Sequence, residues 1–228
     1  MLYTAQNVRD NIRNKDGKRV FYLGKGDSLT SEARDYLQRE RIEILPAEKA
    51  RQGEYRALGG GYFREKPEDM THLNGDFLVK KTHPRILFRG AVDTLEAELL
   101  LAQKETGLSA PLQEGLDLAR ALIAADVLEK EMQALRLGGM DDAELRKRSH
   151  FPQDYYGIPH FMPSASDGPL IARLNRCRCV AREAELKAVA AFSDRDGNPT
   201  RIDILQAMNR LSSMLYILMI RCKKQGRI

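Results

Sequence analysis

The sequence predicts a mainly α protein, a helical bundle preceded by a small α/β unit. From about residue 85 onward, apolar residues recur every three or four positions in four long segments, which is the spacing of amphipathic helices. Stretches rich in Gly, Pro and Ser separate these segments, and four such helices joined by loops favour a bundle of four or five helices. The chain has 228 residues, of which 43% are hydrophobic, so it can form one main core and a small appendage.

The first part of the chain has a different pattern. A short apolar run at 20–23, a helix with Thr30 as its N-cap and a second apolar run at 42–45 predict a strand–helix–strand unit. A unit this small cannot cover its own faces, so we expect it to dock on the main domain or on a partner. Three glycines at 59–61 mark a connection. The predicted parts are an α/β unit at 1–52, a linker at 53–70 and a helical domain at 71–228.

Five helices are expected in the helical domain. The last one follows Pro199 and opens with Thr200 and Asp203, a spacing typical of a capping box. The stretch 155–169 is rich in Pro, Gly and Ser and is expected to be a loop. The expected helices are 85–107, 112–127, 141–150, 168–192 and 201–223.

Charge and composition narrow the classes of function. A net charge of +5 at pH 7 leaves nucleic acid, a membrane surface or an anionic small molecule open as partners. Aromatic residues make up only 7% of the chain and no run of five or six basic residues occurs, which argues against a nucleic-acid platform. No apolar run is long enough to cross a bilayer, and the N-terminus lacks the pattern of a signal peptide. We therefore expect a soluble cytoplasmic protein with no nucleic-acid or membrane partner.

No metal site is expected. The four histidines show no paired spacing. Cys177 and Cys179 lie two residues apart on a predicted helix, so their side chains point to roughly opposite sides and cannot chelate one ion. Together with Cys222 they form no disulfide framework, and we interpret them as small core or groove-lining side chains.

Polar residues on the last two helices suggest an anion site. Arg178, Arg182 and Glu185 follow one another at i, i+4 and i+7, so a helix places them along one face. Two arginine forks one turn apart suit a polyphosphate, although such a pattern is more often a solvated face with an Arg–Glu pair. A long apolar helix contains Asn209, Arg210, Ser212 and Ser213, and because buried polar groups need partners, this favours the anion site.

The motifs around these residues resemble a known family. LNRCRCVAREAE from Leu174 and AMNRLSSMLYILM from Ala207 resemble two helices of the ATP:cobalamin adenosyltransferases, the PduO-like superfamily. MTHL from Met70 and KKTHPRILFRGAVDTLEAELL from Lys80 are closer to the EutT-type enzymes of ethanolamine utilization. The order and spacing of the motifs together carry the resemblance, which spans nearly the whole chain. It implies a four- or five-helix bundle of the PduO-like type.

The resemblance also implies a reaction. The 5′-deoxyadenosyl group of ATP is transferred to cobalamin in its Co(I) state, and triphosphate is released. Because cobalt is the nucleophile, no Ser, Cys or Lys nucleophile is required. The expected cofactor is Mg²⁺. The resemblance also implies a homo-oligomer with the site between subunits, a trimer preferred and a dimer possible. The expected partner enzyme is an ethanolamine ammonia-lyase, often associated with a bacterial microcompartment.

The same resemblance implies the nucleotide-binding residues. Lys81, twelve residues before Asp93, and Arg182 would hold the triphosphate, with Arg178 close by. The fuller glycine-rich pattern of the family's phosphate-contacting segment is missing, so the match there is loose. The other implied nucleotide-binding positions are Thr71, Asn74, Glu185, Asn209 and Arg210.

Two further residues are implied at the corrinoid. Asp93, in GAVDTLEAE, is expected to pair with Arg178 across a subunit interface and to shape the corrinoid site. Phe161, in PHFMPSASDG, is expected to wall off the lower face of the corrinoid, which disfavours a lower ligand and makes Co(II) easier to reduce. His160 is the alternative at this place, and a histidine facing the cobalt could coordinate it.

Two departures from the family pattern leave alternatives open. Glu183 stands where the family has a second arginine, so one basic contact is lost or is replaced by Arg176 or Arg210. The cysteine-rich segment that EutT-type proteins often carry before the THL motif is absent, so no transition-metal site is carried over. Both departures favour an alternative function, a non-catalytic sensor of ATP or corrinoid or a cobalamin chaperone. A basic nucleic-acid-binding bundle rests on net charge alone and ranks last.

Overall fold

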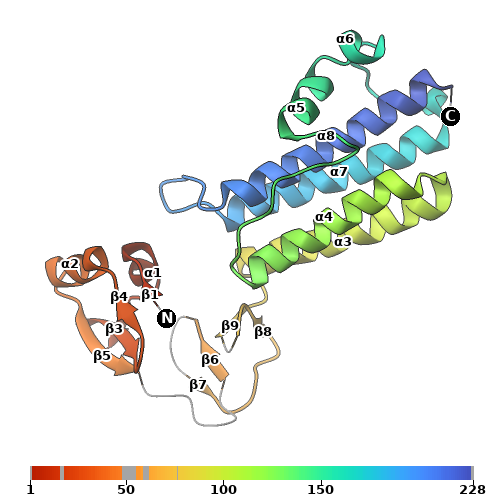
Figure 1. The fold of residues 1–228 in the computed structure, drawn as a ribbon. Helices are drawn as coiled ribbons and strands as arrows, with labels where there is room; N and C mark the ends of the chain where they lie inside the picture. Colours follow the sequence, from red (N-terminus) through yellow and green to blue (C-terminus); the bar gives the residue numbers. More distant parts are fainter. Residues whose placement is uncertain (1, 16–17, 48–54, 59–61, 76, 227–228) are drawn as a thin grey trace. The chain divides into compact units, whose positions relative to one another are not determined.

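The structure, a computed structural model, describes residues 2–15, 18–47, 55–58, 62–75 and 77–226. The chain forms two compact units, residues 1–81 and residues 82–228 (Figure 1). The glycines predicted to form a connection at 59–61 lie outside the described residues.

The first unit contains one β–α–β connection, which confirms the predicted strand–helix–strand pattern. β3 and β5 pair in parallel, α2 connects them, and β2 adds to β3 in the antiparallel direction. Thr30 caps α2, because its side chain accepts the Ala33 N–H at 3.2 Å. Val8, Phe21 and Leu37 belong to the small core. The elements are β1 (Leu2–Tyr3), α1 (Ala5–Asp10), β2 (Arg13–Lys15), β3 (Lys18–Gly24), β4 (Ser28–Leu29), α2 (Ser31–Arg39) and β5 (Glu43–Ala47).

A second sheet follows in the same unit. Its strand order is β7-β6-β9-β8, with β6 and β9 parallel and the two outer pairs antiparallel. Ala57, Met70 and Leu78 are buried against one another, so part of the predicted linker at 53–70 forms strands. The three-part division of the chain stays a prediction. The strands are β6 (Tyr55–Ala57), β7 (Tyr62–Phe63), β8 (Met70–His72) and β9 (Phe77–Lys80).

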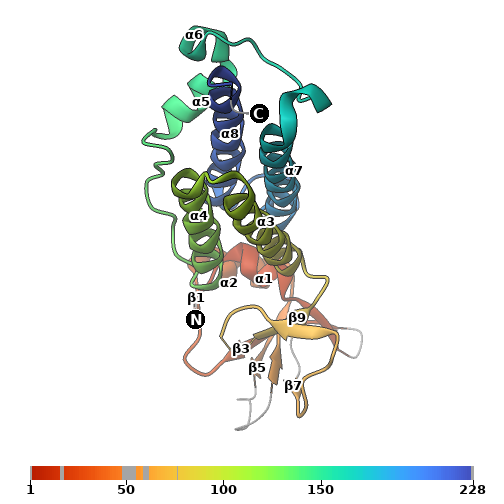
Figure 2. The same ribbon diagram turned by 90° about the vertical axis from the view of Figure 1, so that its right-hand side faces the viewer.

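The second unit is the predicted helical bundle. α7 packs on α3 and α8, α4 packs on α3 and α8, and the four long helices lie side by side (Figure 1). The short helices α5 and α6 lie against α8, as Figure 2 shows. Within the described residues, none of the helices is both long enough and apolar enough to span a membrane. The helices are α3 (Pro84–Thr106), α4 (Ser109–Val127), α5 (Asp142–His150), α6 (Pro152–Tyr156), α7 (Gly168–Ala191) and α8 (Ile202–Lys224), with a 3₁₀ turn η1 (Ala165–Asp167).

Local chemistry explains the ends of α3 and the start of α5. α3 begins at Pro84, which needs no N–H partner at the first position, and His83 caps it by accepting the Arg85 N–H on Nδ1 at 3.2 Å. It ends at Gly107, whose φ of 68° is the left-handed conformation that glycine adopts without strain. Asp141 and Glu144 form a capping box at the start of α5.

The start of α8 differs from the prediction. The Thr200 hydroxyl donates to the Phe192 carbonyl at 2.9 Å instead of capping the helix. The Asp203 carboxylate accepts from the Arg201 guanidinium at 2.8 Å and from the Met132 N–H at 2.9 Å. The predicted capping box is therefore wrong, because tertiary partners take both of its side chains. The expected loop at 155–169 is also interrupted, by the end of α6 and by η1.

Candidate functional site

Three of the predicted site residues lie in the first unit. Thr71 lies on β8 and is half-buried, and Asn74 follows in a turn where its carbonyl accepts the Phe77 N–H at 3.1 Å. Lys81 is exposed. Its neighbour Lys80 forms an ion pair with Asp69, and the hydrogen bond from Lys80 lowers the pKa of that carboxyl. Lys80 is thus paired with a carboxylate, while Lys81 is exposed and its charge contributes less to lowering the pKa of the same carboxyl.

In the second unit, α7 presents a polar face. Asn175, Arg178, Arg182 and Glu185 recur every three or four residues, so they line one side of the helix. All four are exposed or half-buried. Buried apolar residues occupy the opposite side and pack into the bundle core; they include Leu174, Cys177, Ala181, Ala184 and Ala188. The predicted face of Arg178, Arg182 and Glu185 is therefore present and open.

α8 places a second polar face beside the first. The Arg178 guanidinium lies 5.5 Å from the centroid of the Tyr216 ring, and the short connection between the two helices makes them antiparallel. On this register Arg182 is level with Ser212, and Glu185 is level with Asn209. We call this set the α7–α8 polar strip: Arg178, Arg182, Glu185, Asn209, Ser212 and Tyr216.

The two arginines of the strip keep donors available. Arg182 is exposed and has no hydrogen bond or ion pair among the residues that the structure describes. Within the described part of the chain, the hydrogen bond of Arg178 is a long one of 3.4 Å to the Asn175 side chain. Each guanidinium carries five N–H donors in a planar fork, so most of these donors face outward without a carboxylate. Such an arrangement suits an anion with several oxygen atoms.

The polar residues of α8 are partly satisfied within the helix. The Ser212 and Ser213 hydroxyls donate to the Asn209 carbonyl at 2.9 and 3.2 Å. The Asn209 side-chain oxygen accepts from Arg210 at 3.0 Å, which leaves the amide N–H donors of Asn209 available. The expectation that buried polar groups in this apolar helix find partners is confirmed for Arg210 and Ser213. Asn209 is exposed and Ser212 is half-buried.

Arg210 contacts the strip only through its hydrogen bond to the Asn209 side chain. It is buried, and its Nε donates to Asp142 at 2.6 Å on a different side of α8. Arg176, the other candidate to replace the arginine missing at Glu183, pairs with Glu98 at 3.1 Å. Both guanidinium groups are held by carboxylates, so neither is a free donor in this protomer. The part of Arg210 in nucleotide binding stays a prediction.

Asp93 is exposed on α3 and makes no ion pair with Arg178 within the described chain. α3 and α7 are antiparallel, since Phe88 packs on Phe192 at one end and Glu105 pairs with Arg173 at the other. Asp93 therefore lies between these ends, at the level of the Arg182–Glu185 turn. An exposed carboxylate at this position is available to a second subunit, and the expected pair with Arg178 stays a prediction.

Phe161 and Arg178 each contact the Tyr216 side chain. The Phe161 ring lies 6.0 Å from the Tyr216 ring, and the Phe161 N–H donates to the Tyr216 hydroxyl at 3.2 Å. The Lys223 ammonium lies 4.3 Å from the centroid of the Phe161 ring and also pairs with Asp167. This ion pair and the Ser164 N–H lower the pKa of Asp167 to about 2. The loop that carries Phe161 is thus attached to α8 at two points.

Comparison with known proteins identifies the family. The family described as cobalamin adenosyltransferase matches residues 61–222, which is most of the chain. The chain belongs to this family. It is 38% identical over 160 residues to the corrinoid adenosyltransferase EutT of Salmonella typhimurium and 37% identical to EutT of Escherichia coli K12. Each alignment covers 68% of this chain but only 59% of the relative.

A solved structure supports the fold. A variant of the PduO-type ATP:corrinoid adenosyltransferase from Lactobacillus reuteri, determined in complex with cobalamin and ATP, superposes with a TM-score of 0.50 at 18% identity. The superposition covers 77% of this chain and 89% of that structure. The adenosyltransferase-type bundle predicted from the sequence is therefore confirmed.

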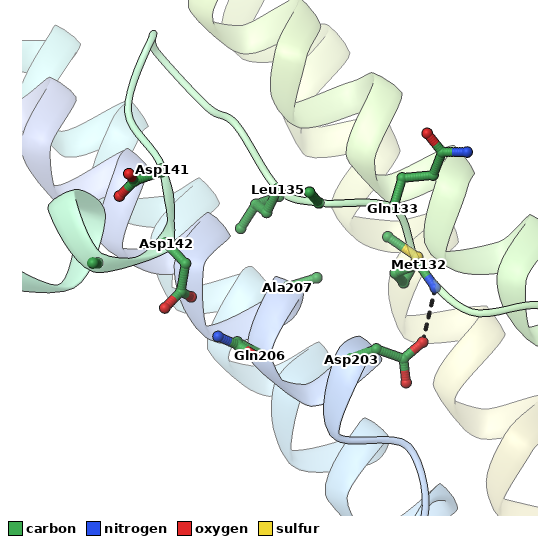
Figure 3. Close-up of a pocket in the computed structure, with 10 residues that line it drawn as sticks. Met132, Gln133, Leu135, Asp141, Asp142, Asp203, Gln206 and Ala207 are labelled. Carbon is green, nitrogen blue, oxygen red and sulfur yellow. Dashed lines mark hydrogen bonds between the residues drawn. The ribbon is translucent and has the colours of Figure 1, made fainter.

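A pocket of about 490 Å³ lies elsewhere on this adenosyltransferase family member. Figure 3 shows it between the segment that precedes α5 and the first turns of α8. Asp142 and Asp203 line it, but Arg210 and Arg201 already pair with these carboxylates. The α8 residues that line it lie on a different side of the helix from Asn209 and Tyr216. The pocket is therefore not the predicted nucleotide site.

Sequence reasoning missed Tyr216. It follows Asn209 by seven residues, two helical turns, and it is a phenol in an otherwise apolar run from Met214 to Ile220. That spacing was the available signal.

Among the described residues, no group of three or more His, Cys, Asp or Glu side chains could hold a metal ion.

Proposed function

We propose that the chain is an ATP:cob(I)alamin adenosyltransferase. The Co(I) centre of reduced cobalamin donates an electron pair to the 5′ carbon of ATP, a Co–C bond forms, and the bond from that carbon to the triphosphate oxygen breaks. Cobalt is oxidised to Co(III) and triphosphate leaves with the bonding pair. The protein must align the 5′ carbon, neutralise the leaving group and exclude water from the corrinoid.

One observation carries this proposal. In a chain of the adenosyltransferase family, Arg178 and Arg182 lie on an open face without a carboxylate partner among the described residues, beside the aromatic loop of Phe161. An unpaired guanidinium fork can bind phosphate oxygens through two parallel hydrogen bonds. EutT of Salmonella typhimurium, at 38% identity, is a corrinoid adenosyltransferase by name, and this supports the same substrates here.

Each role can be given to a residue. Arg182 and Lys81, with Arg178 close by, bind the triphosphate and stabilise the charge that it gains on leaving. When bound, Mg²⁺ would neutralise part of that charge. The remaining nucleotide contacts are assigned to Thr71, Asn74, Glu185, Asn209 and Arg210.

On the corrinoid side, the Phe161 ring covers the lower face of the corrinoid. A hydrocarbon ring offers cobalt no lone pair, so Co(II) stays without a lower ligand and is easier to reduce. Asp93 pairs with Arg178 of a second subunit and closes the site. This requires a homo-oligomer, for which we prefer a trimer over a dimer.

The adenosylcobalamin formed would serve an ethanolamine ammonia-lyase in the cytoplasm, in association with a bacterial microcompartment. The likeness to the two EutT proteins supports this setting. The α/β unit at 1–52 is the proposed docking element. A pull-down with the chain and with a variant lacking residues 1–52 tests this: identical partner capture would contradict the docking role.

The reaction is tested by anaerobic incubation with chemically reduced cobalamin, ATP and Mg²⁺, following the corrinoid absorption spectrum. We expect conversion to adenosylcobalamin, and loss of conversion in folded Arg182→Ala and Asp93→Ala variants. Binding of ATP and corrinoid without conversion would instead support the sensor or chaperone function. Absence of binding to either substrate would overturn both.

A further inference from the structure

The Tyr216 hydroxyl stands at the centre of a small hydrogen-bond network. Its oxygen lies 3.1 Å from His160 Nδ1 and accepts the Phe161 N–H at 3.2 Å. The other ring nitrogen of His160, Nε2, lies 2.9 Å from the His150 carbonyl oxygen. The His160 and Tyr216 rings stack with centroids 5.7 Å apart and an angle of 11° between their planes.

The partners fix the proton positions. A backbone carbonyl can only accept, so His160 Nε2 must carry a hydrogen and donate it to His150. In the neutral imidazole, Nδ1 then holds the lone pair and accepts the Tyr216 O–H. The Tyr216 oxygen still has lone pairs, one of which accepts the Phe161 N–H. With His160 neutral, each polar atom in this contact therefore has a matched partner.

The consequence concerns metal binding. Neutral imidazole coordinates a metal through its unprotonated nitrogen, here Nδ1, and the Tyr216 O–H occupies that lone pair. His160 is exposed, so burial alone does not keep it from a ligand. Its Nδ1 can coordinate only if the hydrogen bond to Tyr216 breaks.

We propose that Tyr216 is a positioning residue that withholds the His160 nitrogen from the corrinoid cobalt and holds Phe161 in its place. The Tyr216 hydroxyl joins His160 and Phe161 to α8 through hydrogen bonds. The Tyr216 ring also stacks with the Phe161 ring and contacts the Arg178 guanidinium. Tyr216 thereby decides which of two adjacent side chains meets the cobalt. The proposal rests on the proposed function for its corrinoid, while the network itself belongs to the protein alone.

The network is tested first without any corrinoid. Nitrogen-15 NMR of the histidine-labelled chain at neutral pH should show His160 as the Nε2–H tautomer with a hydrogen-bonded Nδ1. In Tyr216→Phe the Nδ1 resonance should shift, and the Phe161 amide should exchange roughly three- to tenfold faster with solvent. The matched control is Tyr155→Phe, a nearby hydroxyl deletion outside the network, which should change neither. An Nδ1–H tautomer in the unsubstituted chain would overturn the proposal.

The consequence for cobalt is tested with cob(II)inamide, which lacks the nucleotide base and so carries no lower nitrogen of its own. Its electron paramagnetic resonance spectrum should show no nitrogen splitting with the unsubstituted chain or with Tyr155→Phe. Tyr216→Phe should introduce such a splitting, which changes its pattern with nitrogen-15 histidine and disappears in Tyr216→Phe/His160→Gln.

The outcomes separate the two proposals. Cobinamide that binds Tyr216→Phe without nitrogen splitting would overturn the role of Tyr216, even if adenosyl transfer is observed. Failure of every form to bind corrinoid would instead overturn the proposed function, and with it the role of Tyr216 at the cobalt. The tautomer measurement would still decide whether the network exists.

Discussion

Two pairs of arginines have the same helical spacing and opposite surroundings. Arg85 and Arg89 lie four residues apart on α3, as Arg178 and Arg182 do on α7. The α3 pair converges on Asp126, which is fully buried: each Nε donates to one carboxylate oxygen at 2.6 Å. The α7 pair has no carboxylate among the described residues.

The difference separates arginines that hold the fold from arginines available to a ligand. A buried carboxylate between two guanidinium groups loses its water and depends on both partners. The cluster also affects His83, whose pKa is lowered by burial and by the charge of Arg85. Arg182 is exposed, and Arg178 contacts the Asn175 side chain and the Tyr216 ring, so among the described residues no carboxylate explains why two forks are placed there. The same spacing therefore serves structure in one helix and, we propose, substrate in the other.

Removing the buried carboxylate should have the largest effect. Asp126→Ala leaves two guanidinium groups without their shared partner, and we expect a loss of about 3–5 kcal/mol in the free energy of unfolding. Urea denaturation measures it. The control is Asp117→Ala, an exposed carboxylate on the same helix, which should change stability by less than about 0.5 kcal/mol. Equal effects of the two variants would contradict the structural role of the α3 pair.

The opposite result is expected on α7. Arg182→Ala should leave the unfolding free energy within about 0.5 kcal/mol of the original, because no internal contact is lost. It should lower kcat/KM for ATP about 100-fold, because a charge that stabilises the leaving triphosphate is lost. Lys187→Ala, an equal loss of charge on another side of α7, is the control and should retain activity. A large loss of stability in Arg182→Ala would show that Arg182, like Arg85 and Arg89, stabilises the fold.

The adjacent lysines Lys80 and Lys81 offer the same contrast between a paired and a ligand-binding side chain. Lys80 pairs with Asp69, whereas Lys81 is the residue that we assign to the nucleotide. Lys81→Ala should raise KM for ATP about tenfold, because one hydrogen bond to a charged group would be lost. Lys80→Ala should leave KM near its original value. Steady-state kinetics would contradict the assignment if the two variants behaved alike.

The smallest effect is expected for the ion pair of Arg201 and Asp203. The Arg201 hydrogen bond lowers the pKa of Asp203 from 3.8 to about 2. A lowered folded-state pKa stabilises the protein above the unfolded value, and this stabilisation is lost as pH falls from 3.8 to about 2. Asp203→Asn should therefore be less stable by about 1 kcal/mol at neutral pH, a modest value for a partly exposed pair.

Urea denaturation across this pH range measures the difference between the two proteins. The difference should shrink as pH falls through the window and vanish near its lower limit. A difference that stayed constant with pH would show that the Asp203 carboxylate contributes no pH-dependent stability.

Residue spacing alone predicts the helical bundle and the face of α7 that carries the candidate site. Apolar spacing of three and four residues forces each long segment to bury one side, so α3, α4, α7 and α8 could be placed from the pattern alone. The same periodicity places Arg178, Arg182 and Glu185 on one face, because helix geometry fixes which residues share a side. The motifs that resemble the adenosyltransferases likewise needed only order and spacing.

Tertiary structure decided which of these residues keep free donors. Nothing in the spacing distinguishes Arg85 and Arg89 from Arg178 and Arg182; only the position of Asp126, 37 residues from Arg89, does. The same holds for Arg210 and Asp142, for the side chains of the expected capping box at Thr200, and for Tyr216 with His160. Hydrogen bonds and ion pairs between distant segments depend on how helices pack, and periodicity within one helix carries no information about the partner that another helix supplies.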